Sequence, residues 1–426
     1  MPGLVSPGSL DSTQPVSSAA DDLLRLLGVP SAVHEHTDTR PHGLELADIV
    51  REHGHRFQSL TTEQRRALKD IASCRTALLG GHVLRCNRCS HFEISYDSCS
   101  NRNCPKCGGL SELRWIERRK ADLLPVEYFH VVFTTPDSLR SLFLANQRIA
   151  YGLLFSAVSE TLLEVARNPE RLGARIGFLA VLHTWTQTLL YHPHIHCIVA
   201  GGGLSEDAKS WIPCKKGYLL PVQVLSPVFR GKLLSKMEVA LANGELRAPA
   251  SDNPTQALKK AASKGWVVYS KPSFAGPDHV IAYLAHYTRR IAISNHRLVS
   301  HQDGNVTFRY TDRANGNKKR LMTLPAEEFL RRFLLHVLPS GFMRVRYYGY
   351  LANAHRTRLL ELIRQILGLV VLLLTPQPQE TWQELILRLT GNDVTRCKQC
   401  GLGQMEDLAV LPPSPKWSTP GRATSP

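Results

Sequence analysis

The stretch His192-Pro193-His194-Ile195-His196-Cys197-Ile198-Val199 decides the fold. Its apolar continuation through Ala200 predicts a β-strand, and strand side chains repeat every two residues, so His192, His194 and His196 project from one face. Two imidazoles in this relation can hold one divalent cation through neutral ring nitrogens. A pair of structural histidines on an exposed strand face is the alternative, and this stretch by itself does not decide between them.

The residues before this strand predict the rest of a mixed α+β layer. Tyr128–Thr134 is β-branched and aromatic, and Pro136 closes it, which is typical of a strand. Ser138–Arg167 reads as a long amphipathic helix, and Ile176–His183 as a second strand. The order strand, helix, strand, strand is the first half of a ferredoxin-like (RRM-like) layer. We therefore expect an α+β fold whose His pair lies on a central antiparallel strand and faces an open cleft.

Two phenols follow later in the chain, at Tyr283 and Tyr287. Pro277 suits the first position of a helix, and Asp278 complements the positive N-terminal end of that helix. On such a helix the two tyrosines, four residues apart, share one face. They are either core aromatics or functional hydroxyls. Their position after the histidine strand and before a basic run favours functional hydroxyls.

Potential metal ligands are most concentrated in a region that contains pairs of cysteines. Cys86-x2-Cys89 and Cys104-x2-Cys107 are two knuckles, each of which can present two thiolates from one tight turn. Two knuckles complete a tetrahedral zinc site. Four thiolates leave no open position for water or substrate, so we expect this zinc ion to be structural.

The sequence does not decide which metal ion, if any, the other cysteines and histidines bind. Cys74, Cys99 and one or both of His82 and His91 could hold a second zinc ion. A last pair, Cys397-x2-Cys400, cannot close a tetrahedral site alone. It either takes partners from elsewhere in the chain or is an unliganded remnant.

Charge predicts a polyanionic partner. The formal net charge is +16 at pH 7 with a pI near 9.5. Between Ile281 and Leu360 there are 14 Lys and Arg against 4 Asp and Glu, which favours nucleic acid over a merely solvated basic face. Basic and aromatic residues alternate in Gly341–Tyr350, which suits either base stacking with phosphate neutralisation or packing of an exposed edge. The arginines expected to contact DNA are Arg102, Arg118, Arg289, Arg290, Arg344 and Arg346.

Composition divides the chain into four parts. Residues 1–40 form a disordered leader rich in Ser, Pro, Asp and Thr, and 41–120 a helical and zinc-binding domain that contacts DNA. Residues 121–350 form the α+β domain, and 351–426 a C-terminal helical region and tail with the lone CxxC pair. No apolar segment resembles a signal peptide or is long enough to cross a bilayer. Cysteines clustered as CxxC pairs then favour metal thiolates in a reducing cytoplasm.

Taken together, these residues resemble the two-tyrosine HUH transposases of rolling-circle insertion sequences, which are bacterial mobile elements. The resemblance covers the chain from about Pro41 to His355. Its most specific segments are Cys74–His82, Ser98–Cys107, Tyr128–Phe133, His183–Trp185, His192–Ser205, Tyr283–Asn295 and Leu338–Phe342.

The resemblance implies a cysteine-rich zinc domain followed by an HUH nuclease domain, in a cytoplasmic, nucleoid-associated protein. His194 and His196 then correspond to the ligands of a catalytic Mg²⁺ or Mn²⁺, and Tyr283 and Tyr287 to the paired nucleophiles. The implied partner is single-stranded DNA at the element ends, with no membrane involved and with a homo-oligomer compatible with the sequence.

The chemistry of tyrosine explains why such a site would need a metal ion. A phenol with a pKa of about 10 is a poor nucleophile until a cation or a base stabilises its phenolate. A metal ion on the His pair would polarise the scissile phosphate, and its third ligand would be Gln187, His192 or His279. We therefore expect a transposase that cleaves and rejoins single-stranded DNA through 5′-phosphotyrosine intermediates. The alternatives are a plasmid replication initiator or relaxase of the same chemistry, and a zinc-bearing DNA-binding regulator without catalysis.

Overall fold

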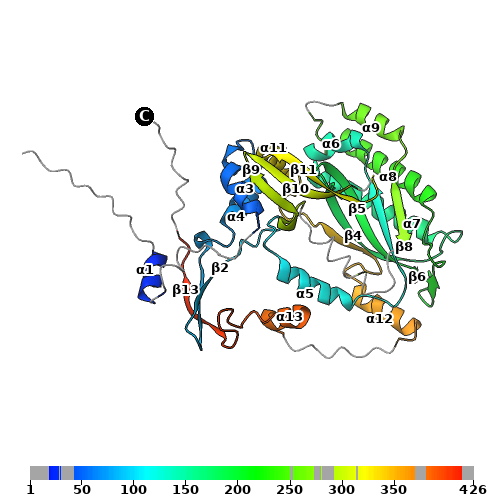
Figure 1. Cartoon of the computed structure of the whole chain (residues 1–426). Helices are drawn as coiled ribbons and strands as arrows, with labels where there is room; N and C mark the ends of the chain where they lie inside the picture. The colour runs from blue at the N-terminus through cyan, green and yellow to red at the C-terminus, as the bar shows by residue number, and fades with distance from the viewer. Residues whose placement is uncertain are drawn as a thin grey trace, which may run out of the picture. The chain divides into compact units, whose positions relative to one another are not determined.

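The computed structural model describes residues 19–27, 29, 43–249, 253–272, 280, 292–312, 315–369 and 380–414. The chain divides into two compact units (Figure 1). Unit 1 comprises Met1–His42, Ser73–Cys99 and Gln383–Pro426, and unit 2 comprises Gly43–Ala72 and Ser100–Trp382. Each unit is described by itself below.

Unit 1 is built on a three-stranded antiparallel sheet in the order β13-β1-β2. Strand β1 spans Gly81–Cys86, β2 Phe92–Tyr96 and β13 Met405–Leu411. The β1–β13 register pairs Gly81 with Leu411 and Cys86 with Met405, so a segment from the end of the chain flanks one from its first quarter. Helix α1, Ala19–Leu26, contributes Leu24 to a small core around Val83 and Leu411.

Unit 2 is organised around a five-stranded antiparallel sheet in the order β12-β4-β5-β3-β8. The strands are β3 Tyr128–Thr134, β4 Gly177–Trp185, β5 Tyr191–Ala200, β8 Val268–Pro272 and β12 Val345–Gly349. Strand β3 has the predicted bounds. Strand β5 lies in the middle of the sheet, which confirms the expected α+β fold with the histidines on a central antiparallel strand.

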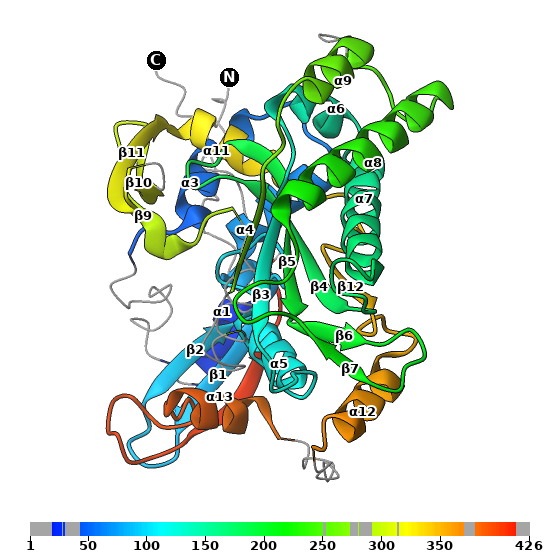
Figure 2. The same ribbon diagram turned by 90° about the vertical axis from the view of Figure 1, so that its right-hand side faces the viewer.

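One face of this sheet is mainly apolar. Odd-numbered residues of β3 and β5, such as Phe133 and Ile195, and even-numbered residues of β4, such as Phe178, are buried on it. Helices α7, Gln147–Arg167, and α8, Val222–Ala242, cover this face, as Figures 1 and 2 show. Strand alternation then forces every intervening side chain onto the opposite face.

Two shorter helices complete this layer. Helix α6 spans Arg140–Ala145 and α9 spans Pro254–Ala262. The sequence predicted one helix over Ser138–Arg167, but the structure divides it between α6 and α7. The break falls at Asn146, whose side-chain NH₂ donates to the carbonyls of Leu142 and Arg247 and whose side-chain oxygen accepts the N–H of Arg247. These bonds hold the Asn146 backbone away from helical dihedrals, at φ −134° and ψ 39°.

Among the described residues, α7 is long and apolar enough to span a membrane by length and composition. Most of it is buried, and its residues Leu154, Phe155 and Val158 belong to the core beneath the sheet. These properties are those of a core helix.

The opposite face of the sheet is divided between a core and an open part. Leu179, Val181 and Ile198 pack against helix α12, Arg356–Ile366, and against Trp115 of helix α5, Gly109–Lys120. Further along the same strands this cover ends, and the residues on that face are histidines. The site therefore lies where the apolar alternation of β4 and β5 gives way to imidazoles.

A second antiparallel sheet in unit 2 has the order β11-β10-β9. It consists of β9 Leu298–Gln302, β10 Asn305–Asp312 and β11 Lys318–Pro325, followed by helix α11, Ala326–Leu334. Asp303 and Gly304 have φ of +50° and +69°, and this left-handed pair forms the tight turn between β9 and β10. Helices α3, Leu46–His53, and α4, Thr62–Ser73, precede the sheets in the chain.

The remaining elements are short. Strands β6 Gly202–Leu204 and β7 Trp211–Pro213 form a two-stranded ribbon, so the three glycines after β5 lead into a strand. Helix α13, Trp382–Thr390, begins at the last residue of unit 2.

Candidate functional site

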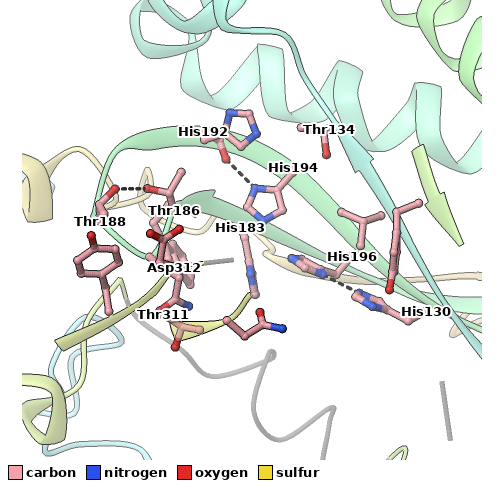
Figure 3. Close-up of a pocket in the computed structure, with 16 residues that line it drawn as sticks. His130, Thr134, His183, Thr186, Thr188, His192, His194, His196, Thr311 and Asp312 are labelled. Atoms are coloured by element: carbon pink, nitrogen blue, oxygen red, sulfur yellow. Dashed lines mark hydrogen bonds between the residues drawn. The ribbon is translucent and has the colours of Figure 1, made fainter. Parts of the chain in front are cut away.

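Three histidines meet on the uncovered face of the central sheet. His183 of β4 lies opposite His194 of β5 in the antiparallel register, and His196 lies two residues further along β5. One ring nitrogen of each lies within 4.8 Å of those of the other two. Figure 3 shows the three rings converging on one space. This distance is short enough for a single metal ion to bind all three.

Hydrogen bonds at Nδ1 set the orientation of two of these rings, His194 and His196. His194 Nδ1 is 2.7 Å from the carbonyl oxygen of His192 and can only donate to it. His196 Nδ1 is 2.8 Å from Nε2 of His130 on β3, and the planes of these two rings are 3° from parallel. Both bonds are drawn in Figure 3. Each bond engages Nδ1 of its ring and fixes the direction of Nε2, as in the supporting shell of metal-bound histidines.

His183 is the third member of the group and was not among the ligands predicted from the sequence. It is buried, at 4% exposure, and its ring stacks on Trp185 with centroids 4.6 Å apart. Residue alternation within β5 could not reveal it, because His183 comes from the neighbouring strand. The register of two predicted strands, had it been fixed, would have placed it opposite His194.

The three candidates for the third ligand have different positions. Gln187 and His192 both line the cavity in front of the histidines. His192 Nδ1 is 3.7 Å from Asp137 Oδ1, and burial followed by Arg140 lowers the pKa of His192, against the effect of Asp137. His279 lies outside the described residues. The structure does not group His192 with His194 and His196.

The histidines open into a cavity of about 980 Å³. Its walls come from β3, the β4–β5 loop, β8 and the β10–β11 hairpin. Threonine hydroxyls line it at Thr134, Thr186, Thr188 and Thr311, and Asp312 is beside them. Asp312 forms an ion pair with Arg320, from Oδ2 to Nε at 3.2 Å. The cavity can therefore contain several nucleotide groups, with hydroxyl donors available for phosphate oxygens.

The β4–β5 loop is held in place by three side chains that bind its carbonyl groups. Arg297 donates to Gln187, Arg332 to Thr188 at 3.1 Å, and His336 Nε2 to Leu189 at 3.1 Å. The buried His336 also accepts the Thr184 hydroxyl at Nδ1, at 3.2 Å. Burial lowers its pKa to about 4, so this imidazole is neutral at pH 7.

A four-thiolate group forms in unit 1. Cys86 Sγ is 3.8 Å from Cys400 Sγ, and Cys89 Sγ is 3.7 Å from Cys397 Sγ, with all four sulfurs within 4.8 Å of one another. The N–H groups of Cys89 and Arg88 point at Cys86 Sγ and lower the pKa of that thiol. The N–H of Gly403 does the same for Cys400, whose pKa falls to about 6. Four cysteine sulfurs this close together, two of them facing backbone N–H groups, fit a structural zinc ion.

This group corrects the predicted pairing of the knuckles. The partners of Cys86 and Cys89 are Cys397 and Cys400, so the last CxxC pair is no remnant. Cys104 and Cys107, the predicted partners, belong to unit 2. Cys74 and Cys99 lie near the two ends of the segment Ser73–Cys99. His82, proposed with them for a second ion, is beside Asp407 across the β1–β13 pair, with Nδ1 3.3 Å from Oδ1.

The predicted DNA-contacting arginines lie in different surroundings. Arg118 is exposed on α5, whereas Arg102 donates to the Phe342 carbonyl oxygen at 2.9 Å. Arg344 is desolvated beside Arg102, which lowers its pKa to about 10. Arg346 stacks on the ring of Phe155, 4.2 Å from the centroid. The stretch Gly341–Tyr350 therefore includes an edge strand, β12, that packs on the core.

Four predicted site residues cannot be placed. Tyr283, Tyr287, Arg289 and Arg290 lie outside the described residues. Val280 is described and fully buried in the core of the histidine face, with Leu179 and Ile198. Ala292 is buried too and borders a small pocket together with Trp185, the residue that stacks on His183.

Two protein-family models match the chain. A family described as "Putative transposase" matches residues 177–358, which include the three histidines. A family described as "Transposase zinc-binding domain" matches residues 46–135.

Individual proteins are similar over most of the chain. "Putative transposase y4qJ" of Sinorhizobium fredii is 46% identical over 385 residues, which are 87% of this chain and 96% of the relative. "Transposase for insertion sequence element IS801" of Pseudomonas savastanoi pv. phaseolicola is 25% identical over 80% of this chain and 82% of its own length. Among solved structures, a copper-bound conjugative relaxase TrwC in complex with oriT DNA covers 39% of this chain and 71% of its own, with 13% identity and a TM-score of 0.20.

Proposed function

Because the chain belongs to the rolling-circle transposases of the IS91 type, which carry a zinc-binding domain, we propose that it cleaves and rejoins single-stranded DNA at the ends of an insertion sequence. The proposed nucleophiles are Tyr283 and Tyr287, and the proposed ligands of a divalent ion are His183, His194 and His196. The observation that carries the proposal is the histidine group, whose three nitrogens lie within 4.8 Å on the wall of a cavity.

The donor set fits a catalytic rather than a closed structural ion. Three protein ligands leave positions for a phosphate oxygen, whereas four thiolates would not. Imidazole nitrogens suit Mn²⁺ and later transition metals better than Mg²⁺, which prefers oxygen. When bound, such an ion would polarise the scissile phosphodiester and offset the charge that develops on it.

The covalent step is a transesterification at phosphorus. The phenol oxygen of one tyrosine loses its proton and forms a bond to phosphorus, while the bond from phosphorus to the 3′ oxygen breaks and that oxygen takes up a proton. The products are a 5′-phosphotyrosine and a free 3′-hydroxyl. The number of phosphoester bonds is unchanged, so the reverse reaction rejoins DNA without another energy source. Two tyrosines allow one to hold the first end while the other cleaves a second site.

The described residues on either side of the tyrosines support this assignment. Val280 is three residues before Tyr283 and is buried on the histidine face of the sheet. Ala292 follows Tyr287 by five residues and lies beside Trp185. Val280 and Ala292 thus both lie close to the strands that carry His183 and His194.

Side chains around the cavity can bind and position DNA without the metal ion. The hydroxyls of Thr134, Thr186, Thr188 and Thr311 can donate to phosphate oxygens. The β4–β5 loop is fixed by Arg297, Arg332 and His336, so these donors are positioned before DNA binds. Zinc on the thiolate group of unit 1 would stabilise the fold of that unit and perform no chemistry.

Covalent capture tests the proposal. Purified protein is incubated with Mn²⁺ and labelled single-stranded oligonucleotides from both ends of the element, and adducts are resolved on denaturing gels. We expect adducts with the wild type, fewer with Tyr283→Phe or Tyr287→Phe, and none with the double variant. Tyr269→Phe, which changes a cavity-lining tyrosine on β8, is the control and should retain adducts. Adducts at wild-type level with the double variant would rule out these nucleophiles.

A further inference from the structure

A second group of ligand-type side chains lies in unit 2, outside the histidine cavity. Glu52 and His53 are the last two residues of helix α3, and His301 is on strand β9. Ligand atoms of the three all lie within 4.8 Å of one another. His53 Nε2 is 2.9 Å from His301 Nε2 and 3.2 Å from Glu52 Oε1, and Glu52 Oε2 is 3.6 Å from His301 Nδ1.

The two imidazoles are almost buried and the carboxylate is at the surface. The side chain of His53 is 3% exposed, that of His301 8%, and that of Glu52 61%. The buried Nδ1 of His53 has no hydrogen-bond partner among the described residues. A buried polar ring of this kind is normally stabilised by strong partners.

The elements that carry these ligands are fixed to each other by contacts that do not involve them. The N–H of Leu46, the first residue of α3, donates to Asn295 Oδ1 just before β9, at 3.1 Å. Arg56, directly after α3, forms an ion pair with Glu327 of α11 at 2.8 Å. The close approach of His53 and His301 is therefore built into the packing of α3 against the β9–β11 sheet, and the site exists before any ion binds.

We propose that Glu52, His53 and His301 bind a divalent transition-metal ion of the zinc class. Two imidazoles and one carboxylate form a ligand set that Zn²⁺ accepts, with water in the fourth position. The exposed carboxylate gives the ion access from solvent. Mg²⁺ and Ca²⁺ are unsuited, because they require mainly oxygen ligands.

The ion would join a helix to the sheet that borders the histidine cavity. Strand β9 pairs with β10, and Tyr310, Thr311 and Asp312 at the end of β10 line that cavity. An ion bound by His53 and His301 would thus stiffen one wall of the DNA-cleavage site from outside. Its role would be structural, and it is separate from both the thiolate group of unit 1 and the three histidines of the sheet.

Metal content of the full-length protein tests the proposal. The protein is saturated with Zn²⁺, dialysed, and its zinc content measured by plasma mass spectrometry. The double variant Glu52→Gln/His301→Gln should contain one zinc ion per chain fewer than the wild type. Glu238→Gln removes the same charge from an exposed carboxylate on α8, away from the site, and should retain the wild-type content. Equal zinc in the double variant and the wild type would overturn the proposal.

A second measurement guards against a folding defect in the double variant. In Co²⁺-substituted protein the thiolate group gives a charge-transfer band that nitrogen and oxygen ligands do not give, so an unchanged band shows that the zinc lost from the double variant was not lost from unit 1. The single variant Glu52→Gln alters only a surface side chain and should weaken binding of one Zn²⁺ at least about tenfold, since a charged ligand is replaced by a neutral one. An unchanged affinity in this folded variant would equally refute the site.

Discussion

At the scale of single residues, His183 determines whether the histidine group can hold an ion. It is the member that comes from β4, and the other two follow each other on β5. Its ring is fixed between Trp185 on one side and His196 on the other, with centroids 4.6 and 4.4 Å away. A residue held this firmly presents its nitrogen at one position, which is the condition for a preorganised metal ligand.

We predict that His183→Gln lowers the rate of Mn²⁺-dependent cleavage of single-stranded DNA by at least about 100-fold, because a lost ligand removes several kcal/mol of transition-state stabilisation. The matched control is His192→Gln, the same change at a histidine on the same face of β5. Its backbone carbonyl, which orients His194, is unaffected, and its rate should stay within a few-fold of wild type. Equal losses in the two variants would contradict the assignment of His183.

Single residues also show which parts of the site could be predicted from the sequence. Periodicity within one strand predicted correctly that His194 and His196 share a face, because that property is local. It could not supply His183, which depends on the register between two strands. The sequence left the third ligand open among Gln187, His192 and His279, and of these His192 lies on the cavity wall outside the histidine group.

At the scale of elements, the β4–β5 loop connects the parts of unit 2 that form the cavity wall. Its carbonyl groups bind side chains from the β9 region and from α11 and its following turn, as described for Arg297, Arg332 and His336. The loop thus joins the central sheet to the β9–β11 sheet. The place of these strands beside the histidines could not be predicted from the sequence, because it rests on contacts between elements distant in the sequence.

The buried His336 makes this loop sensitive to acid. Its pKa is lowered from 6.5 to about 4 in the folded protein, so between these values the unfolded chain binds a proton that the folded chain does not. The stabilising contribution is complete above pH 6.5 and is lost as the pH falls toward 4. We expect the free energy of unfolding to fall in this window by up to about 1.4 kcal/mol per pH unit from this group.

The variant His336→Gln, which keeps a side-chain N–H donor for Leu189, removes the titrating ring. Denaturant unfolding followed at several pH values should show a shallower acid dependence for the variant than for the wild type. A variant with the same slope as the wild type would exclude His336 as the source.

At the scale of the whole molecule, the cysteines show what sequence spacing cannot determine. Proximity in the sequence favoured pairing Cys86 and Cys89 with Cys104 and Cys107. The structure instead pairs them with Cys397 and Cys400 through the antiparallel β1–β13 register, which places Cys86 opposite Met405. Local pattern indicates a knuckle and its chemistry, but only the tertiary pairing of strands selects the partner knuckle. The zinc-binding character and the family were nevertheless recognised correctly, since both rest on motifs.

We predict that Cys397→Ser/Cys400→Ser loses one zinc ion per chain and destabilises the β13-β1-β2 sheet, because a structural zinc contributes directly to folding. Hydrogen exchange of the β1 amides should accelerate at least about 100-fold. The control Cys214→Ser changes a half-buried cysteine of unit 2 and should alter neither property. Retention of zinc and of β1 protection in the double variant would show that these thiolates are not partners.

We propose above all that His183, His194 and His196 hold one divalent ion in the cavity of the proposed DNA-cleavage site. Anomalous diffraction at the manganese edge, from crystals soaked in Mn²⁺, tests it most directly. The account predicts a peak within bonding distance of one nitrogen from each of the three rings, about 2.0–2.3 Å as for other first-row ions. A peak bound by His192 or Gln187 in place of His183, or a cavity without manganese when Mn²⁺-dependent cleavage is observed in solution, would contradict it.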